Sequence, residues 1–246
     1  MAGTPAGSCA AGEQPKSLAR LKERERRTLV LVKFSPPRVS ETGQRWADRL
    51  RCEHRAHELL ESAGIASCRS RLFTYDERTY LEIERFDRLG RQGRHGVVSL
   101  RAVDLTRYGK LDRWSECARR PHNERLLSSA DTERIGFLEA FAMLIANTDR
   151  HFGNITLFDR YEGAFELAPA YDMLPMLFAP QHEQIVEREY LPPTPTAALL
   201  RTGPAARALA EHYWTFLVDD ERLSEAFRRI CARSLETLRD ASGKAH

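Results

Sequence analysis

The sequence has few cysteines and no long hydrophobic run. Its five cysteines, at positions 9, 52, 68, 117 and 231, are widely spaced and odd in number, which indicates neither a CxxC zinc site nor a disulfide framework. The longest apolar run, residues 135–146, is shorter than the roughly 20 residues of a membrane span and contains Glu139. The N-terminal residues lack the basic and apolar regions of a secretory signal. We therefore expect a soluble, cytoplasmic protein that does not contact a membrane.

Glycine, proline and net charge are also unremarkable. With 14 Gly and 12 Pro, the chain is neither collagen-like nor of low complexity. The 38 basic residues nearly balance the 35 acidic ones, and the net charge is +3. A nucleic-acid binder would need its basic residues gathered on one surface, so we expect no direct nucleic-acid contact.

The N-terminal part combines strands with one helix. Alternating or apolar segments at residues 17–21, 28–34, 71–75 and 79–86 predict two hairpins, and residues 46–63 predict a helix between them. We interpret residues 1–88 as a small α+β lobe.

The remainder, residues 89–246, is expected to form a mostly helical lobe. Residues 131–147 carry an i, i+3, i+4 apolar stripe and predict a helix capped by Asp131 or Thr132. A short β-hairpin is predicted within residues 154–172, and two further helices at about 205–218 and 221–240. Two sets of side chains are expected to fill the core rather than to act chemically: the aromatic residues Trp114, Tyr213, Trp214 and Phe216, and the cysteines Cys52, Cys68, Cys117 and Cys231.

The segment Asn147-Thr-Asp-Arg-His-Phe-Gly-Asn154 contains the most informative residues. Asp149 and Asn154 have the D-x-x-x-x-N spacing of kinase catalytic loops, in which the Asp orients the attacking hydroxyl and the Asn binds magnesium. A second acid, Asp172, follows the predicted hairpin, which would bring it back towards Asn154. Carboxylate and amide oxygens suit Mg²⁺, so these residues predict a phosphoryl-transfer site.

The N-terminal lobe has residues that such a site would need. Alternation in residues 28–34 places Lys33 on the same face as Leu31. On the predicted helix, Glu53 shares a stripe with Trp46 and His57, so its carboxylate can face Lys33 as in the Lys–Glu pair of kinases. Taken singly, a Lys in a strand or a Glu on a helix stripe is more typical of a surface position. Their order along the chain favours the kinase interpretation.

Four segments resemble the HipA family of bacterial serine/threonine-protein kinases, the toxins of type II toxin–antitoxin systems. They are NTDRHFGNITLF, FELAPAYDMLP, WADRLRCEHRAHELLESAGI and YLEIERFDR, and the resemblance extends from about Ser8 to Tyr190. It is strongest to the branch that includes YjjJ and the short HipT-type toxins. The resemblance implies a bilobal protein-kinase-like α+β fold, with a small antiparallel sheet in the N-lobe and a mostly helical C-lobe.

The resemblance also implies the role of each site residue. Asp149 would be the catalytic aspartate, and Asn154 and Asp172 the Mg²⁺ ligands. The residues expected at bound ATP are Gly12 and Lys16 of a glycine-rich loop, Lys33, Glu53, Glu84, Arg85 and Phe86 of the hinge, His151, Asn154, Tyr171 and Asp172.

The sequence departs from the family pattern at its N-terminus. The loop has one glycine, Gly12, between Cys9 and Lys16, and the autophosphorylated serine of the family falls on or beside Cys9, next to Ser8. Family members also carry an N-terminal subdomain before this loop. We expect that subdomain to be supplied by a small partner protein, or the reading frame to be shortened.

The leading hypothesis is an ATP- and Mg²⁺-dependent protein kinase of a toxin–antitoxin system. The resemblance suggests an aminoacyl-tRNA synthetase as substrate and an antitoxin as partner. Two other hypotheses are a catalytically degenerate module that binds an antitoxin or DNA-binding partner, and a lipid kinase. The full set of Lys33, Asp149, Asn154 and Asp172 argues against the first. The lack of a basic amphipathic helix argues against the second.

Overall fold

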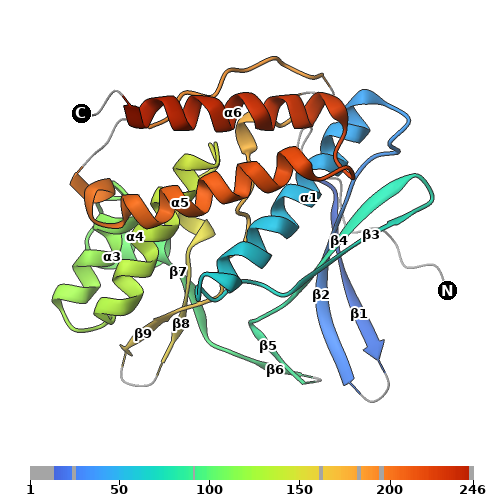
Figure 1. Ribbon diagram of the computed structural model, residues 1–246. Coiled ribbons are helices and arrows are strands. Elements are labelled where there is room, and N and C mark those ends of the chain that lie inside the picture. The colour runs from blue at the N-terminus through green and yellow to red at the C-terminus, as the bar shows by residue number, and fades with distance from the viewer. Residues whose placement is uncertain are drawn as a thin grey trace.

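The computed structural model describes residues 14–23, 26–90, 92–160, 163–181, 184–193 and 197–243. A four-stranded antiparallel sheet with the order β1-β2-β4-β3 forms one side of the molecule (Figure 1). Its strands are β1 (Lys16–Glu23), β2 (Arg26–Phe34), β3 (Ser70–Tyr75) and β4 (Arg78–Glu84). The two predicted hairpins are confirmed, and they join through the pairing of β2 with β4.

Helix α1 (Glu41–Ser62) begins earlier than the sequence indicated. The Ser40 hydroxyl oxygen accepts a hydrogen bond from Gly43 N at 3.0 Å, and Glu41 lies in the first turn, where its charge favours the helix dipole. The predicted stripe of Trp46, Glu53 and His57 is buried, but so is most of the opposite face. The helix is therefore enclosed by protein on both sides.

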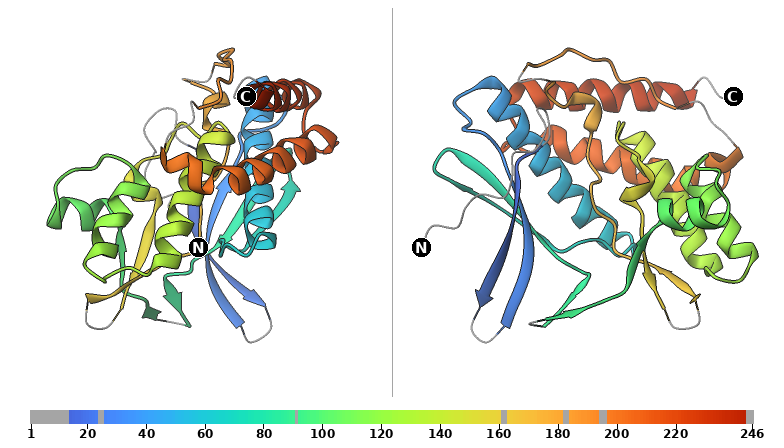
Figure 2. Two further views of the ribbon diagram at one scale, coloured as in Figure 1. Left: turned by 60° about the vertical axis from the view of Figure 1, so that its left-hand side comes forward. Right: turned by 180° about the vertical axis from the view of Figure 1, so that it is seen from behind.

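The second half of the chain is largely helical and lies on the other side of α1. Its helices are α2 (Leu100–Arg107), α3 (Trp114–Asn123), α4 (Ser129–Leu144), α5 (Ala197–Asp219) and α6 (Glu225–Gly243). Helices α5 and α6 run along the top of Figure 1, with α1 passing beneath them towards the sheet, and the view from behind in Figure 2 shows the same arrangement.

Helix α4 begins at a different cap from the one predicted. Its N-cap is Ser128, whose hydroxyl oxygen accepts from Asp131 N at 3.0 Å, so the expectation of Asp131 or Thr132 was wrong. Asp131 instead forms an ion pair with Arg134 at 2.9 Å and lies within the helix. The helix therefore starts three residues earlier than predicted, with the Ser128 hydroxyl satisfying one of the free amides of its first turn.

The hairpin predicted after residues 147–154, the segment that we call the catalytic loop after its proposed role, is present as part of a larger sheet. Strands β8 (Thr156–Asp159) and β9 (Phe165–Leu167) pair, and β7 (Val97–Ser99) adds to the outer edge of β8. A short ribbon of β5 (Arg88–Leu89) and β6 (Gly93–Arg94) lies between the two sheets in the chain. The chain therefore returns from the catalytic loop to Asp172 through β8 and β9.

One cluster of buried side chains joins the two halves of the molecule. It includes Cys52, Ala56 and Leu60 of α1 together with residues of α4, α5 and α6. Of the expected core aromatics, Trp114, Tyr213 and Trp214 are at most 1% exposed, and Phe216 is half-buried and packs against this cluster. Within the described residues, no helix is both long and apolar enough to cross a membrane.

Candidate active site

The main cavity lies between the four-stranded sheet and the catalytic loop. Its volume is about 470 Å³, and its walls come from β1, β2, α1, the end of β4 and the segments around Asp149 and Asp172. The site residues predicted from sequence that line it are Lys16, Lys33, Glu84, Arg85, Phe86, Asp149, His151, Tyr171 and Asp172. Segments far apart in the sequence therefore meet at one cavity, as the kinase hypothesis requires.

Lys33 is the centre of the polar contacts in this cavity. Its Nζ donates to both carboxylate oxygens of Glu53, at 2.7 and 2.9 Å, and also to Asp172 Oδ1. Lys16 is directly opposite Lys33 in the β1–β2 pairing, and both side chains face the cavity. Lys33 on β2 thus lies between Glu53 and Asp172, and Lys16 on β1 lies beside it.

The charges of this cluster depend on one another. Burial alone would lower the pKa of Lys33, but Glu53 and Asp172 raise that pKa above its ordinary value. Burial raises the pKa of Glu53. Burial would also raise the pKa of Asp172, yet the charge of Lys33 holds it below its usual range. Lys33 is therefore a cation at neutral pH, and Asp172 is a carboxylate.

Two asparagine side chains hold the catalytic loop around Asp149. Asn147 Oδ1 accepts from Asp149 N at 3.0 Å, and Asn147 Nδ2 donates to Asp172 O at 3.0 Å. Asn154 Nδ2 donates to Asp149 O at 2.8 Å. Asn147 is fully buried and links the backbones of both acids. The Asp149 side chain is exposed and remains available to a substrate.

His151 and Tyr171 support the same loop. His151 Nδ1 accepts from Gly153 N at 3.0 Å and caps the short helix η1 (Phe152–Asn154). Tyr171 OH donates to Gly153 O at 2.7 Å and also bonds the Thr156 hydroxyl at 2.7 Å. Burial raises the pKa of Tyr171 to about 12, so its phenol stays protonated and donates. Tyr171 thereby ties the segment of Asp172 to the catalytic loop.

The predicted hinge connects β4 to the second half of the chain. Arg85 N donates to Leu29 O at 3.0 Å, which extends the β2–β4 pairing past Glu84. The Arg85 guanidinium forms a two-point ion pair with Asp87, with both contacts at 2.6 Å. The Phe86 ring packs against Tyr171, with centroids 6.0 Å apart. The contact between Phe86 and Tyr171 thus connects the hinge to the segment that bears Asp172.

Arg49 is a cavity residue that was not predicted from the sequence. It is 1% exposed, and its Nε and Nη1 have no hydrogen-bond partner. Among the described residues no carboxylate lies within ion-pair distance of it, although its guanidinium stacks on Trp46 at 4.5 Å. Burial lowers the pKa of Arg49 to about 10. The sequence did contain a signal for this position. Arg49 lies four residues before Glu53, and residues i and i+4 share a helix face, so both side chains could be expected to face the cavity.

The donor set fits Mg²⁺ on the Asp172 side. Lys33 contacts only Oδ1 of Asp172, which leaves the second carboxylate oxygen for a ligand. In Asn154 the amide nitrogen is used by Asp149 O, so the ligand atom would be Oδ1. The described residues contain no group of three or more acidic, His or Cys side chains that could hold a metal. One carboxylate with an amide oxygen is the sparse set that Mg²⁺ uses when phosphates complete its coordination.

Three predicted residues stand apart from the cavity wall. Glu53 is fully buried behind Lys33, and the predicted Lys–Glu pair forms there. Asn154 is 4% exposed and lies beneath the loop, in contact with the backbone of Asp149. Gly12 lies outside the described residues, as do Ser8 and Cys9.

Comparison with known proteins identifies the family of the chain. Residues 8–239 match the family of HipA-like C-terminal domains. The chain belongs to this family. Toxin YjjJ of Escherichia coli K12 is 35% identical over 250 residues, which cover 99% of the chain and 55% of YjjJ. This HipA-like chain thus spans about half the length of that curated relative.

Two solved structures share the fold. The Helicobacter pylori proinflammatory kinase CtkA superposes with a TM-score of 0.58 at 16% identity, over 98% of this chain and 92% of CtkA. A chain from the complex of Shewanella oneidensis MR-1 HipA and HipB with operator DNA gives a TM-score of 0.55, also at 16% identity. That match covers 97% of this chain and 65% of the other. The predicted bilobal α+β fold of the HipA type is confirmed.

Proposed function

We propose that this HipA-like chain is a protein kinase that transfers the γ-phosphoryl group of ATP to a serine or threonine hydroxyl. The observation that carries the proposal is Lys33, held by Glu53 and Asp172 in a cavity that Asp149 also lines. Phosphoryl transfer depends mainly on positioning and charge stabilisation, and this set supplies both.

Some of the site residues would bind ATP, the phosphoryl donor, and Asp149 would act on the substrate hydroxyl, the phosphoryl acceptor. Lys33 would bind a phosphate oxygen in exchange for its contact with Asp172, while Glu53 keeps the ammonium in place. Arg49 would bind a further phosphate oxygen through its unpartnered N–H groups, since a buried cation without an ion pair favours an anionic ligand. Asp172 and Asn154 would hold Mg²⁺, which neutralises phosphate charge. Asp149 would accept or orient the proton of the substrate hydroxyl.

The relatives support a proposal for the partner and for the class of substrate. One neighbour was solved with HipB and operator DNA, and one relative is described as a toxin. We infer that this chain also works with an antitoxin-like protein and modifies a bacterial protein. Mass spectrometry of a cell lysate incubated with the chain and ATP would identify that substrate, with an aminoacyl-tRNA synthetase as the expected class.

The test is transfer of ³²P from labelled ATP by purified variants. We expect Asp149→Asn and Asp172→Asn each to lower transfer about 100-fold or more, because each removes a charge used in the reaction. Asp159→Asn is the matched control. Asp159 is exposed at the end of β8, does not line the main cavity and lies outside the catalytic loop. Circular dichroism should show all three variants folded.

Undiminished transfer by both cavity variants would contradict the assignment. A wild-type chain whose melting temperature is unchanged by ATP with Mg²⁺ would instead support a module that only binds a partner.

A further inference from the structure

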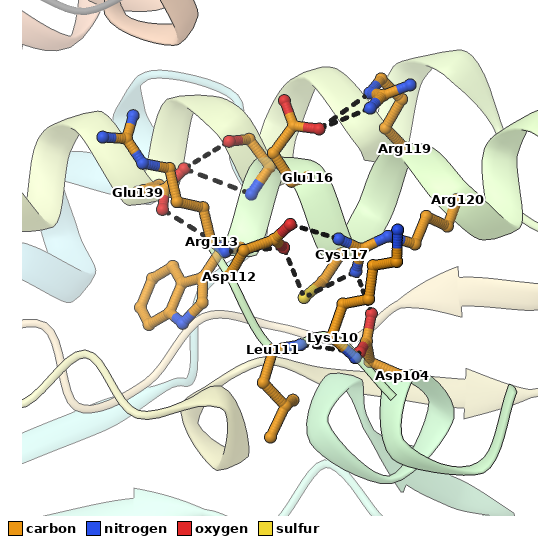
Figure 3. Close-up of polar contacts among 12 residues, drawn as sticks. Asp104, Lys110, Leu111, Asp112, Arg113, Glu116, Cys117, Arg119, Arg120 and Glu139 are labelled. Carbon is orange, nitrogen blue, oxygen red and sulfur yellow. Dashed lines mark hydrogen bonds and ion pairs between the residues drawn. The ribbon is translucent and has the colours of Figure 1, made fainter. Parts of the chain in front are cut away.

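Glu53 is a buried carboxylate that has few hydrogen-bond donors. Its exposed fraction is 0%, and among the described residues only Lys33 Nζ donates to it, at 2.7 and 2.9 Å. Asp104 is equally buried but accepts from two backbone amides, both at 2.9 Å, and from the Arg120 guanidinium (Figure 3). A buried carboxylate is stabilised by each donor that shares its charge. Glu53 therefore has acceptor capacity for a donor other than Lys33.

The His57 imidazole lies beside the Glu53 carboxylate, one turn further along α1. Its Nε2 is 3.9 Å from Glu53 Oε1 and has no hydrogen-bond partner. The residue is 3% exposed, and burial lowers its pKa to about 3, so the imidazole is neutral at physiological pH. In a buried site, a bare ring nitrogen would set its lone pair against the carboxylate, whereas an Nε2–H attracts it. The tautomer that carries its hydrogen on Nε2 is therefore favoured.

Ser70, at the start of β3, connects His57 to a second histidine of α1. Its Oγ is 3.0 Å from His57 Nδ1 and 2.8 Å from His54 Nδ1. When the hydrogen of His57 is on Nε2, Nδ1 is an acceptor and receives the Ser70 hydroxyl hydrogen. Ser70 Oγ then accepts in turn, and His54 Nδ1 is the donor. The hydrogen bonds run in one direction, from His54 through Ser70 to His57, whose Nε2–H is left for Glu53.

The surroundings of His54 are compatible with this direction. In the neutral imidazole its Nε2 is then bare, 3.7 Å from Glu58 Oε1. The Glu58 side chain is 49% exposed, so water screens its charge, and two cations, Arg55 and Arg222, act on the same imidazole. The reverse direction would place the bare nitrogen beside buried Glu53, where the charge is not screened. A protonated His54 would still donate from Nδ1, so the direction holds in both charge states.

We propose that His57 is a positioning residue: its Nε2–H, set by this hydrogen-bond chain, holds the Glu53 carboxylate against Lys33. The contact matters when the ammonium of Lys33 exchanges Asp172 for a phosphate oxygen, because Glu53 must keep that ammonium in place during the exchange. His57 does not line the main cavity and acts only through Glu53. The effect on transfer rests on the kinase activity proposed above, whereas the hydrogen-bond chain does not depend on it.

Two substitutions of equal length separate the donor from the volume of the side chain. His57→Gln keeps an N–H near the position of Nε2, whereas His57→Met has none. The measurement is ³²P transfer from saturating labelled ATP with Mg²⁺ to the proteins of a bacterial lysate. We expect His57→Met to lower the rate about 5- to 20-fold and His57→Gln to stay within about twofold of the wild type. A residue that only fills space would respond alike to both substitutions.

Substitutions of Ser70 test the chain one step away from His57. Ser70→Ala removes the hydroxyl and should lower the same rate about 3- to 10-fold, and Ser70→Thr, which keeps the hydroxyl, should retain the wild-type rate. Ser129→Ala is the matched control, because its hydroxyl bonds Glu133 on the exposed side of α4 and lies outside the chain. Circular dichroism should show all of these variants folded.

The ¹⁵N NMR signals of the ring nitrogens report the tautomer without any need for activity. We expect His57 of the wild type to carry its hydrogen on Nε2, and Ser70→Thr to preserve that signal. In Ser70→Ala the acceptor Nδ1 loses its donor, so the signals should shift towards a mixture of both tautomers. His212, at an exposed position, should give the same signal in all three proteins.

Each contrary result overturns a defined part. A wild-type His57 with its hydrogen on Nδ1 would overturn the direction of the chain and with it the proposed donor. Equal rates in His57→Gln and His57→Met would overturn the positioning role. Absence of transfer by the wild type, with the hydrogen of His57 on Nε2, would refute the kinase proposal while supporting the hydrogen-bond chain.

Discussion

Arg49 and Arg51 are buried arginines of the same helix with different surroundings. Arg51 Nη1 lies 3.6 Å from Asp48 Oδ1, whereas Arg49 has no ion pair among the residues that the structure describes. A buried charge without a partner costs stability and is retained where it serves binding or catalysis. Arg49 is therefore the residue at which stability and activity should respond in opposite directions.

The first prediction compares these two arginines. Arg49→Met should leave the free energy of unfolding unchanged or raise it by about 1 kcal/mol, because a methionine has no charge to bury. It should also lower transfer from ATP at least tenfold. Arg51→Met should lower the free energy of unfolding by about 2 kcal/mol, because buried Asp48 loses its ion pair and keeps only neutral hydrogen-bond donors from Gln44 and Ser224. Urea unfolding and ³²P transfer measure both effects.

Loss of stability in Arg49→Met without loss of transfer would show that the guanidinium is structural. Arg49→Lys, which keeps the charge but loses the planar geometry, should retain part of the activity.

His57, next to Glu53, should make the stability of the protein depend on pH. Its Nδ1 bonds the Ser70 hydroxyl at 3.0 Å, and its Nε2 lies 3.9 Å from Glu53 Oε1. Burial, together with the nearby charge of Lys33, lowers the pKa of His57 to about 3. The imidazole is therefore neutral in the folded protein at physiological pH.

The second prediction follows from this lowered pKa. Below about pH 6.5 an unfolded chain binds a proton at the imidazole and the folded chain does not, so stability present above that pH is lost as pH falls towards 3. The free energy of unfolding should drop by up to about 1.4 kcal/mol per pH unit from this residue. His57→Asn should remove that part of the slope between pH 6 and 4.5, whereas His212→Asn, at an exposed position, should keep it. Identical slopes in all three proteins would be inconsistent with a buried neutral His57.

At the level of elements, the catalytic loop depends on Asn147 at the end of α4. This side chain accepts from Asp149 N and donates to Asp172 O, so one amide orients two acids. Asp172 itself has a φ of +55°, a left-handed conformation that is uncommon for a residue other than glycine. The hydrogen bond from Asn147 helps to hold that conformation.

The third prediction tests this double contact. Asn147→Asp keeps an acceptor for Asp149 N but places a carboxylate against the carbonyl of Asp172. We expect kcat to fall at least tenfold with little change in KM for ATP, and the free energy of unfolding to fall by about 2 kcal/mol. Asn123→Asp, at the exposed end of α3, is the control and should match the wild type. A rise in KM alone would instead indicate that nucleotide binding is disturbed.

The sequence predicted those elements whose signals are local. Alternation found β2 and the hairpins, and the stripe on α1 placed Glu53 opposite Lys33. It did not reveal β7, which has only three residues and pairs with a strand almost 60 residues away. Arg49 was missed because a helix stripe does not show that a charged residue lacks a partner. Asn147 was missed because its second contact exists only when Asp172 has folded back.

At the level of the whole molecule, the predicted boundary at residues 88 and 89 cuts through a continuous core. Tyr213 OH donates to Cys52 O at 3.1 Å, and Asp48 accepts from Ser224 N at 3.1 Å and from its hydroxyl at 2.6 Å. The N-terminal helix is thus bonded to the segments at both ends of the α5–α6 connection.

The fourth prediction concerns cooperativity. We expect far-UV circular dichroism and tryptophan fluorescence to report a single coincident unfolding transition in urea. Tyr213→Phe should lower the midpoint of both probes together, with a loss of about 1 kcal/mol, because it removes one buried hydrogen bond. Separate transitions would show that residues 1–88 fold independently of the rest.

The anchoring of α1 also limits how the proposed kinase activity could be switched. Swinging this helix outwards would separate Glu53 from Lys33, which is one way to silence a kinase. In this chain such a swing would have to break the bonds to Tyr213 and Ser224 and open the shared core. The Lys33–Glu53 pair is therefore expected to stay formed in the folded protein, and control of the proposed activity would have to come from blocking entry to the main cavity.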